Sequence, residues 1–197
     1  MILYRCLAWN ERAAPDKPDG ALSFPRVYQG EGRHDNPDVY GCLYLSEAPL
    51  SCVVEQLARF RGQRLTPSLL LRRGLPLALA ELELPDGTEF VDLDDPAVLR
   101  RERLRPSLVA TRQRDITRPQ ARVLHERHLN AAGLRWWSTF ESLWANVTLF
   151  DRAEPGLRPI RTRQVQSLVI SMAAATLLAA GGIILLVVAS KQPKRIG

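Results

Sequence analysis

The hydrophobic positions in the first third of the chain predict a strand, a loop, a second strand and a helix, in that order. Residues 1–9 begin as an apolar, strand-like stretch, and the proline-, aspartate- and glycine-containing segment 10–20 then predicts a loop. Strand character returns at 41–45. Apolar side chains then recur at helical spacing through 49–61, which predicts an amphipathic helix with Ser46 placed to cap it.

The rest of the polar and apolar pattern, as far as residue 157, continues to mix strands and helices. Residues 75–91 have a β-like pattern, and Asp-Asp-Pro opens a short arginine-rich helix over 94–104. A further helix is predicted over 119–132, ended by Gly133. Two strands rich in Trp, Phe, Val and Thr follow, at 134–140 and 144–150. The sequence therefore predicts one α+β domain over 1–157, with a mixed sheet and flanking helices.

Residues 167–190 form a long apolar run without a charged side chain. As a helix, such a run would extend roughly 36 Å at about 1.5 Å per residue, enough to cross a hydrocarbon core of about 30 Å. We expect a transmembrane helix at 167–190, preceded by a linker at 158–166 and followed by a basic tail at 191–197. The alternative is a terminal helix buried against the domain, which the alanines and the Gly181-Gly182 pair would tolerate.

The basic excess of the chain is concentrated around this apolar run. The formal net charge of +6 comes from 27 basic and 21 acidic residues. Six of the basic residues follow Gly156, where no acidic residue occurs: Arg158, Arg161, Arg163, Lys191, Lys194 and Arg195. The remainder has equal numbers of basic and acidic residues, so its composition does not indicate a nucleic-acid partner. The flanking basic groups suit anionic lipid headgroups instead.

The simplest topology is a cytoplasmic domain anchored to a membrane at its C-terminus, because no apolar signal segment opens the chain. If the apolar run packs on the domain instead, a cytoplasmic protein without an anchor is expected. Ser171, Ala175 and Ala179 form a small-residue stripe that could bring two such helices together as a homodimer. Chance explains that stripe equally well in an alanine-rich segment.

Neither the cysteines nor the histidines have the spacing of a metal site. Cys6, Cys42 and Cys52 show no paired zinc-ligand pattern, and their odd number does not suggest a disulfide framework. His125 and His128 stand at helical spacing but lack partner ligands in the sequence around them. We expect no metal, and we expect the cysteines to act as small buried hydrophobic residues.

Four side chains from separate segments are candidates for binding and cleaving a charged ligand: Arg33, Tyr44, Glu55 and Ser138. Arg33 lies in a glycine-rich turn segment, where its guanidinium could bind phosphate or carboxylate in bidentate geometry. Glu55 interrupts an apolar helix face and needs a partner such as Arg33 if it points inward. Tyr44 could stack on a ligand ring, and Ser138 stands among aromatic residues, where a hydroxyl needs a specific partner.

Each of these residues also has an ordinary structural interpretation. Arg33 could be a surface arginine, and Tyr44 could fill the core. Glu55 could face water beside Arg59, one helical turn away. Ser138 could be a hydrogen-bonded serine of the core. Taken singly, none of the four residues decides between structure and function.

Three segments taken together resemble the RES domain family. They are Gly-Arg-His-Asp-Asn-Pro at 32–37, Tyr-Gly-Cys-Leu-Tyr-Leu-Ser-Glu at 40–47 followed by Glu55, and Trp-Trp-Ser at 136–138. The family is named for an arginine, a glutamate and a serine, which Arg33, Glu55 and Ser138 match in the same order. The resemblance covers roughly residues 3–155. It implies a fold similar to ADP-ribosyltransferases, NAD as the substrate and, as in many members, a toxin with a cognate antitoxin as partner.

The resemblance also implies a role for each matched side chain. It places Arg33 on the NAD phosphates, Tyr44 against the nicotinamide or its ribose, Glu55 at the ribose hydroxyls, and Ser138 in the ligand pocket. The expected activity is cleavage of the nicotinamide–ribose bond, by an NAD glycohydrolase, an NAD phosphorylase or an ADP-ribosyltransferase. A membrane-tethered nucleotide- or protein-binding module without turnover is the alternative. The apolar C-terminal run is not an expected part of the family.

Overall fold

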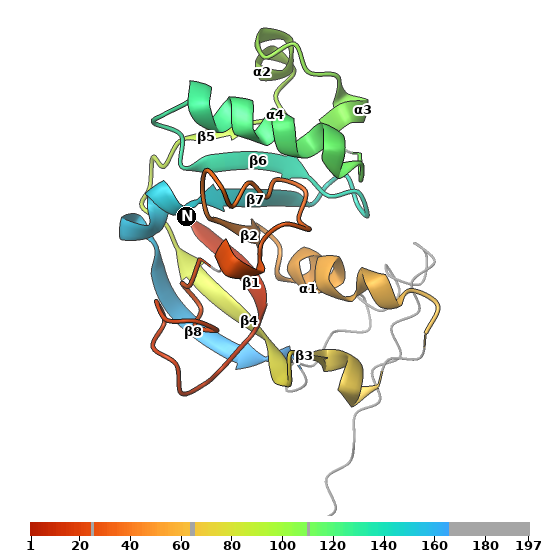
Figure 1. The fold of residues 1–197 in the computed structure, drawn as a ribbon, viewed down its shortest axis with the longest axis vertical. Helices are drawn as coiled ribbons and strands as arrows, with labels where there is room; N and C mark the ends of the chain where they lie inside the picture. Colours follow the sequence, from red (N-terminus) through yellow and green to blue (C-terminus); the bar gives the residue numbers. More distant parts are fainter. Residues whose placement is uncertain (25, 64–65, 110, 166–197) are drawn as a thin grey trace, which may run out of the picture.

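The computed structural model describes residues 1–24, 26–63, 66–109 and 111–165, and shows a mixed eight-stranded sheet with flanking helices (Figure 1). The strands are β1 (Ile2–Ala8), β2 (Cys42–Ser46), β3 (Leu71–Arg72), β4 (Leu75–Glu83), β5 (Phe90–Asp92), β6 (Gly133–Trp137), β7 (Ala145–Phe150) and β8 (Arg158–Gln164). The α-helices are α1 (Pro49–Leu57), α2 (Pro96–Arg101), α3 (Pro106–Val109) and α4 (Arg114–Arg127). Short 3-10 helices are η1 (Arg26–Tyr28), η2 (Ala58–Phe60), η3 (Pro67–Leu70) and η4 (Asp151–Gly156). The predicted α+β class is confirmed.

The sheet consists of two halves that meet at a single point of pairing. Its strand order is β3-β4-β1-β2-β7-β6-β5, with β8 on β4, and the pairing of β5 with β6 is parallel. In the part of the chain that the structure describes, β1 and β2 are in register only at Tyr4 and Ser46. Figure 1 shows β2, β7 and β6 running across the view, whereas β1, β4 and β8 run obliquely. Beyond Tyr4 and Ser46 the two halves therefore separate, and residues from both face the space between them.

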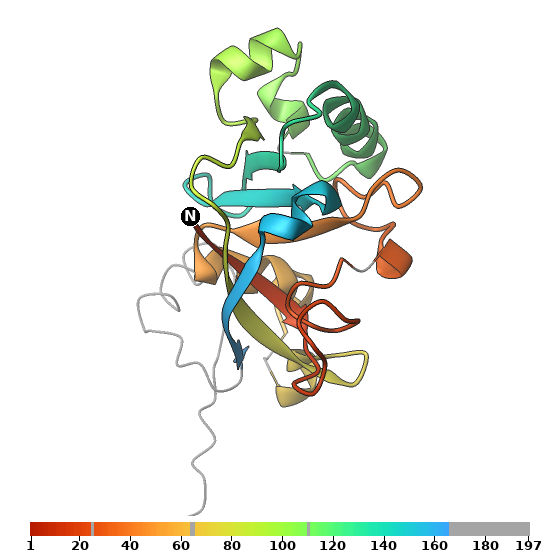
Figure 2. The same cartoon turned by 90° about the vertical axis from the view of Figure 1, so that its left-hand side faces the viewer.

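Helices cover the two halves of the sheet separately, as Figures 1 and 2 show. A cluster that includes Leu99, Leu124 and Trp136 packs α2 and α4 against β5, β6 and β7. A second cluster packs α1 against β1 and β4 through Val54 and Leu77, among others. Burial of apolar area contributes about 25 cal/mol per Å² to folding, so these clusters fix where each helix lies.

The helix predicted at 119–132 lies five residues earlier, as α4. Pro119 is the sixth residue of this helix, where its missing N–H costs one internal hydrogen bond without ending the helix. Gly133 does not end the helix but begins β6. A Cβ atom at Gly133 would lie 2.1 Å from the carbonyl oxygen of Thr148 on β7, so the glycine permits close approach of two strands. Similarly, Ala48 rather than Ser46 stands at the start of α1.

The segment expected to be a linker at 158–166 is instead largely strand β8, which pairs antiparallel with β4. Its residues are mostly polar and exposed, as in an edge strand, where charged side chains discourage pairing with other chains. Arg161, for example, forms an ion pair with Glu81 on β4. The folded domain therefore continues past residue 157, because the edge of β4 needs a partner for its backbone groups.

The expected transmembrane helix at 167–190 and the basic tail at 191–197 lie outside the described residues. Among the helices in the described ranges, none combines the length and the apolar character that crossing a membrane requires. The membrane anchor therefore stays a prediction from the sequence.

Candidate functional site

A cavity of about 660 Å³ opens where the two halves of the sheet separate. One wall comes from β1 and the β3–β4 hairpin, and the other from β2, β6 and β7. Arg33, Tyr44 and Glu55 all line it, although they come from a loop, a strand and a helix. The volume is within the range of small-molecule and cofactor sites, about 300–1,000 Å³.

At this cavity the backbone of β2 forms hydrogen bonds with a side chain instead of with a neighbouring strand. The Gln29 amide nitrogen donates to the Cys42 carbonyl at 2.6 Å, and the Gln29 amide oxygen accepts from the Cys42 N–H at 3.3 Å. A side-chain amide thus takes the place of a neighbouring strand at this residue. This arrangement lets β1 and β2 diverge without leaving the backbone of Cys42 unpaired.

Glu55 is held in place by two donors that converge on one carboxylate oxygen. The Ser138 hydroxyl donates to Glu55 Oε1 at 2.7 Å, and the Asn146 amide donates to the same atom at 3.0 Å. Asn146 is itself oriented by Ser51, whose hydroxyl donates to Asn146 Oδ1 at 2.8 Å. Within the described ranges, no hydrogen bond reaches Glu55 Oε2. The second carboxylate oxygen is therefore available to a ligand in the cavity.

Arg33 approaches the same cavity from the loop before β2. Its guanidinium lies 4.4 Å from the centre of the Trp136 ring and donates to the Val109 carbonyl at 3.0 Å. Burial lowers the pKa of Arg33, and the nearby negative charge of Glu55 opposes this effect. No ion pair between Arg33 and Glu55 is found in the described part of the chain. The two groups thus face one cavity without neutralising each other directly, which differs from the pairing considered from sequence.

Tyr44 belongs to a hydrogen-bonded turn that fixes the Arg33 loop. Its hydroxyl donates to Asp35 Oδ1 at 2.7 Å and accepts from the His34 N–H at 2.9 Å. Burial raises the pKa of Asp35, but hydrogen bonds from Gly30, Tyr44 and Gly32 outweigh it and hold that pKa below its usual value. A Cβ at Gly32 would lie 2.4 Å from both the Asp35 carboxylate and the Tyr44 hydroxyl, so glycine is required there. The loop that presents Arg33 is therefore rigidly specified.

The structure brings all four sequence-predicted residues to one region, but in two layers. Arg33, Tyr44 and Glu55 line the cavity, whereas Ser138 is only 2% exposed and lies behind Glu55. Sequence reasoning missed Asn146, which donates a hydrogen bond to the same Glu55 oxygen as Ser138. A polar residue in the apolar strand 144–150 was the available signal.

Arg5 is a second site residue that sequence reasoning missed. It lines the cavity, is 8% exposed, and donates to the carbonyls of Gly20 and Ala21 at 3.3 and 2.6 Å. Burial lowers the pKa of Arg5 to about 10, so it stays charged at neutral pH. In the described residues no carboxylate forms an ion pair with it. A buried guanidinium of this kind is suited to an anionic ligand.

Cys6, Cys42 and Cys52 also line the cavity, but none of the three is activated as a nucleophile. Burial raises the pKa of Cys6 to about 12 and the pKa values of Cys42 and Cys52 well above the usual value. Because the thiolate is the reactive form, these thiols are inert at neutral pH. The chemistry of the cavity therefore depends on its carboxylate and its guanidinium groups.

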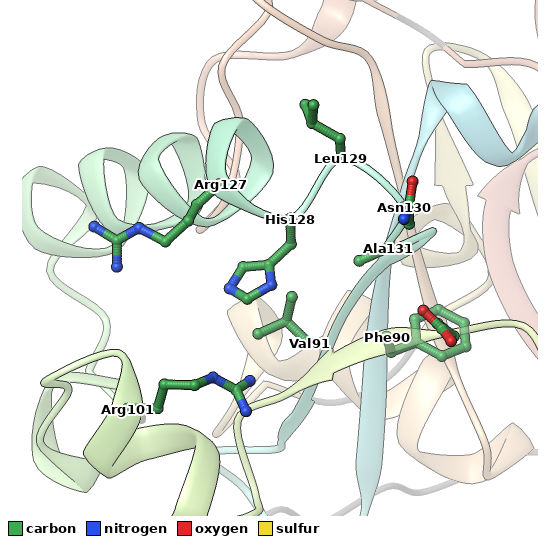
Figure 3. Close-up of a pocket in the computed structure, with 9 residues that line it drawn as sticks. Phe90, Val91, Arg101, Arg127, His128, Leu129, Asn130 and Ala131 are labelled. Atoms are coloured by element: carbon green, nitrogen blue, oxygen red, sulfur yellow. The ribbon is translucent and has the colours of Figure 1, made fainter.

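A second cavity, of about 450 Å³, lies between α2, the end of α4 and β5. Figure 3 shows Arg101 and His128 extending toward the region beside Val91, while the Arg127 side chain extends away from it along α4. All three contact the carboxylate of Glu102, at 3.1, 2.8 and 3.0 Å respectively, and its side chain is only 2% exposed. The hydrogen bonds of these three side chains to Glu102 thus join α2 to α4. None of the four sequence-predicted residues lines this cavity.

Comparison with known proteins gives a matching family and a similar solved fold. No curated protein matches the sequence. The fold is similar to a chain in the crystal structure of the M. tuberculosis MbcT–MbcA toxin–antitoxin complex, with a TM-score of 0.61 and 17% identity over 83% of each chain. The sequence profile of the RES domain matches residues 2–171, most of the chain. The chain therefore belongs to the RES domain family.

Proposed function

We propose that this protein cleaves the nicotinamide–ribose bond of NAD. The observation that carries the proposal is the Glu55 carboxylate, held through one oxygen by Ser138 and Asn146 and open to the cavity through the other. Arg33 lines the same cavity from the loop that precedes β2. Family membership supports the choice of NAD, as the resemblance in sequence already implied.

In the proposed complex, Arg33 and Arg5 bind the pyrophosphate of NAD. Guanidinium groups form short, charge-assisted and often bidentate hydrogen bonds with phosphate oxygens. The Arg33 guanidinium is already held over the Trp136 ring, so that little conformational entropy is lost on binding. Tyr44 lies next to this position on β2 and contacts the nicotinamide nucleoside.

The reaction breaks the bond between C1′ of the ribose and the pyridinium nitrogen. Both electrons of that bond go to the nitrogen, so that nicotinamide leaves as a neutral molecule and the ribose becomes oxocarbenium-like. The negative charge of Glu55 stabilises this cation at the point where it develops. A nucleophile then adds to C1′ and loses its proton. Because the leaving group is neutral, no strong general acid is required.

Ser138 acts in this proposal through Glu55, as a positioning residue. Ser138→Ala removes one of the two donors to Glu55 Oε1, and we expect kcat for nicotinamide release to fall about tenfold with little change in KM. Ser142→Ala, which alters an exposed serine in the same loop, is the matched control. A raised KM with unchanged kcat would instead place Ser138 in substrate binding.

The activity is tested by incubating the purified full-length chain with NAD and measuring free nicotinamide by chromatography. Release of nicotinamide is expected whether water, phosphate or a protein accepts the ADP-ribose. A folded protein that binds NAD without releasing nicotinamide would favour the binding-module alternative. A folded protein that neither binds nor cleaves NAD would rule out the proposal.

We further propose that the protein is the toxin of a toxin–antitoxin pair. Depletion of NAD would account for toxicity, and a cognate antitoxin is the expected partner. The RES domain and the fold shared with a chain of the MbcT–MbcA complex support this role.

A further inference from the structure

Three arginines of the cavity have no part in the proposed chemistry. Arg59 follows α1, while Arg72 and Arg73 lie at the β3–β4 turn, and all three line the cavity. Burial lowers the pKa of Arg72, and the like charges of Arg59 and Arg73 lower it further. Clustering of like charges is unfavourable unless an anion binds between them.

Among the described residues, one member of this cluster is neutralised by a direct ion pair. Arg73 pairs with Asp19, whereas Arg72 donates to the neutral Gln56 side chain at 2.9 Å. In the ranges that the structure describes, neither Arg59 nor Arg72 forms an ion pair. Two guanidinium groups are therefore available to an anionic ligand.

The charge of the whole cavity exceeds what NAD requires. Its lining includes these cationic residues: Arg5, Arg33, Arg59, Arg72, Arg73, Arg112 and Arg114. It includes these acidic ones: Asp19, Glu31, Asp35 and Glu55. Three positive charges remain, whereas the two phosphates of NAD are partly offset by its cationic nicotinamide ring. A phosphomonoester adds about −1.5 to −2 charges at neutral pH, which matches the surplus.

The cluster also has a surface on which an adenine ring can stack. The Arg73 guanidinium lies 4.3 Å from the centre of the Tyr28 ring, and Tyr28 is 56% exposed. Arg73 and its ion-pair partner Asp19 both adopt left-handed backbone conformations, with φ of 52° and 63°. Such conformations are uncommon for residues other than glycine and occur preferentially at ligand-binding positions.

The loop from Tyr28 to Arg33 connects this cluster to the site of the proposed chemistry. Tyr28 contacts Arg73 at one end, and Arg33 faces Glu55 and Trp136 at the other. Between them, the negative charge of Glu31 acts on Arg72. In the proposed complex, with the nicotinamide ribose at Glu55 and the phosphates at Arg33, the adenosine of the dinucleotide lies at the Tyr28 end of this loop, beside Arg73.

We propose that Arg59, Arg72 and Arg73 bind a phosphate group on the adenosine ribose, so that the enzyme accepts NADP as a substrate. The inference rests on the proposed cleavage of NAD, because that reaction defines which end of the dinucleotide lies at Glu55. Arginine is the residue that accommodates the 2′-phosphate of NADP in other dinucleotide sites.

The first experiment compares NADP with NAD as substrates of the full-length chain, in phosphate-free buffer, by nicotinamide release. We expect kcat/KM for NADP to equal or exceed that for NAD. Efficient cleavage of NAD with at least tenfold lower kcat/KM for NADP would overturn the inference and leave the proposed function intact.

A binding measurement separates the inference from the activity. Calorimetry should show adenosine 2′,5′-bisphosphate binding at least tenfold more tightly than 5′-AMP, which lacks only the 2′-phosphate. This preference is expected even if neither dinucleotide is cleaved, a result that would contradict the proposed cleavage but leave the phosphate-binding role of the arginine cluster intact. Equal affinity for the two nucleotides would overturn the inference.

A variant then assigns the preference to the cluster. Arg72→Gln should lower the ratio of kcat/KM for NADP to that for NAD by about tenfold, and lower the affinity for the bisphosphate similarly. Arg122→Gln is the matched control, because Arg122 lies on α4 outside the cavity and pairs with surface carboxylates. An unchanged ratio in Arg72→Gln would show that the cluster does not recognise the phosphate.

Inorganic phosphate is the other anion that Arg59, Arg72 and Arg73 could bind. If the cluster recognises a nucleotide, millimolar phosphate should displace the bisphosphate only weakly. Displacement by phosphate at concentrations similar to those of the bisphosphate would identify a site for the free anion and overturn the assignment to NADP.

Discussion

Replacing Glu55 with glutamine should reduce nicotinamide release by about a hundredfold to a thousandfold. The substitution removes the negative charge that would stabilise the oxocarbenium-like ribose, and losses of this size are typical when one electrostatic contact to a transition state is removed. The geometry of the site should persist, because a glutamine Oε1 can still accept hydrogen bonds from Ser138 and Asn146. We therefore expect the effect in kcat, with binding of NAD largely retained. Steady-state kinetics of nicotinamide release is the measurement.

Glu126→Gln is the matched control for this variant. Glu126 is exposed on α4, where it pairs with Arg122, and exposed ion pairs contribute only about 0–1 kcal/mol to stability. Expression in bacteria gives a second comparison, because growth arrest should follow from the wild type and from Glu126→Gln but not from Glu55→Gln. Full turnover in a folded Glu55→Gln protein would show that this carboxylate is not the catalytic group.

Acidification to pH 5 should destabilise the fold by about 2 kcal/mol through His34 alone. His34 is 3% exposed, and its Nδ1 lies 2.7 Å from the Thr148 hydroxyl. Burial, assisted by the positive charge of Arg33 and opposed by Asp35, lowers the pKa of His34 from 6.5 to about 3. The folded protein thus holds this ring neutral at a pH where the unfolded chain protonates it. Stability is fully present above the unfolded pKa and decreases as the pH falls below about 6.5.

Urea denaturation of the wild type and of His34→Gln at pH 7.5 and pH 5 measures this contribution. The variant should be less stable at pH 7.5, since it loses packing against Trp136, but its stability should fall by about 2 kcal/mol less on acidification. His125, whose pKa burial also lowers, is present in both proteins and cancels in the comparison. Equal losses in the two proteins would mean that His34 is not the group that titrates.

The functional site shows which contacts cannot be predicted from short stretches of the sequence. The order Arg33, Glu55, Ser138 and the flanking motifs indicated the family, and the RES domain profile confirms it. The sequence suggested Arg33 as one possible partner of an inward-facing Glu55. In the structure Arg33 contacts Val109 and Trp136, which are distant in sequence. Which buried polar groups meet depends on strand order and helix docking, and no spacing along one chain segment encodes these.

The helix boundaries illustrate the same limit on a smaller scale. Proline and glycine predicted a helix that begins at Pro119 and is ended by Gly133, because these residues commonly mark helix ends. In the structure Pro119 lies inside α4, and Gly133 is required by the neighbouring strand β7. Gly133 does constrain the backbone, but the constraint comes from a contact across the sheet and not from a helix end.

By itself, the sequence determined the α+β class, the approximate positions of most strands and helices, and the residues that carry the family motif. These follow from side-chain periodicity and from chemistry confined to short segments. Only the tertiary structure decided that β1 and β2 separate beyond Tyr4 and Ser46, that Ser138 lies behind Glu55, and that β8 completes the edge of β4. Each of these features depends on pairing between segments far apart in the chain, where backbone hydrogen bonding and burial of the whole domain, not local preference, set the lowest free energy.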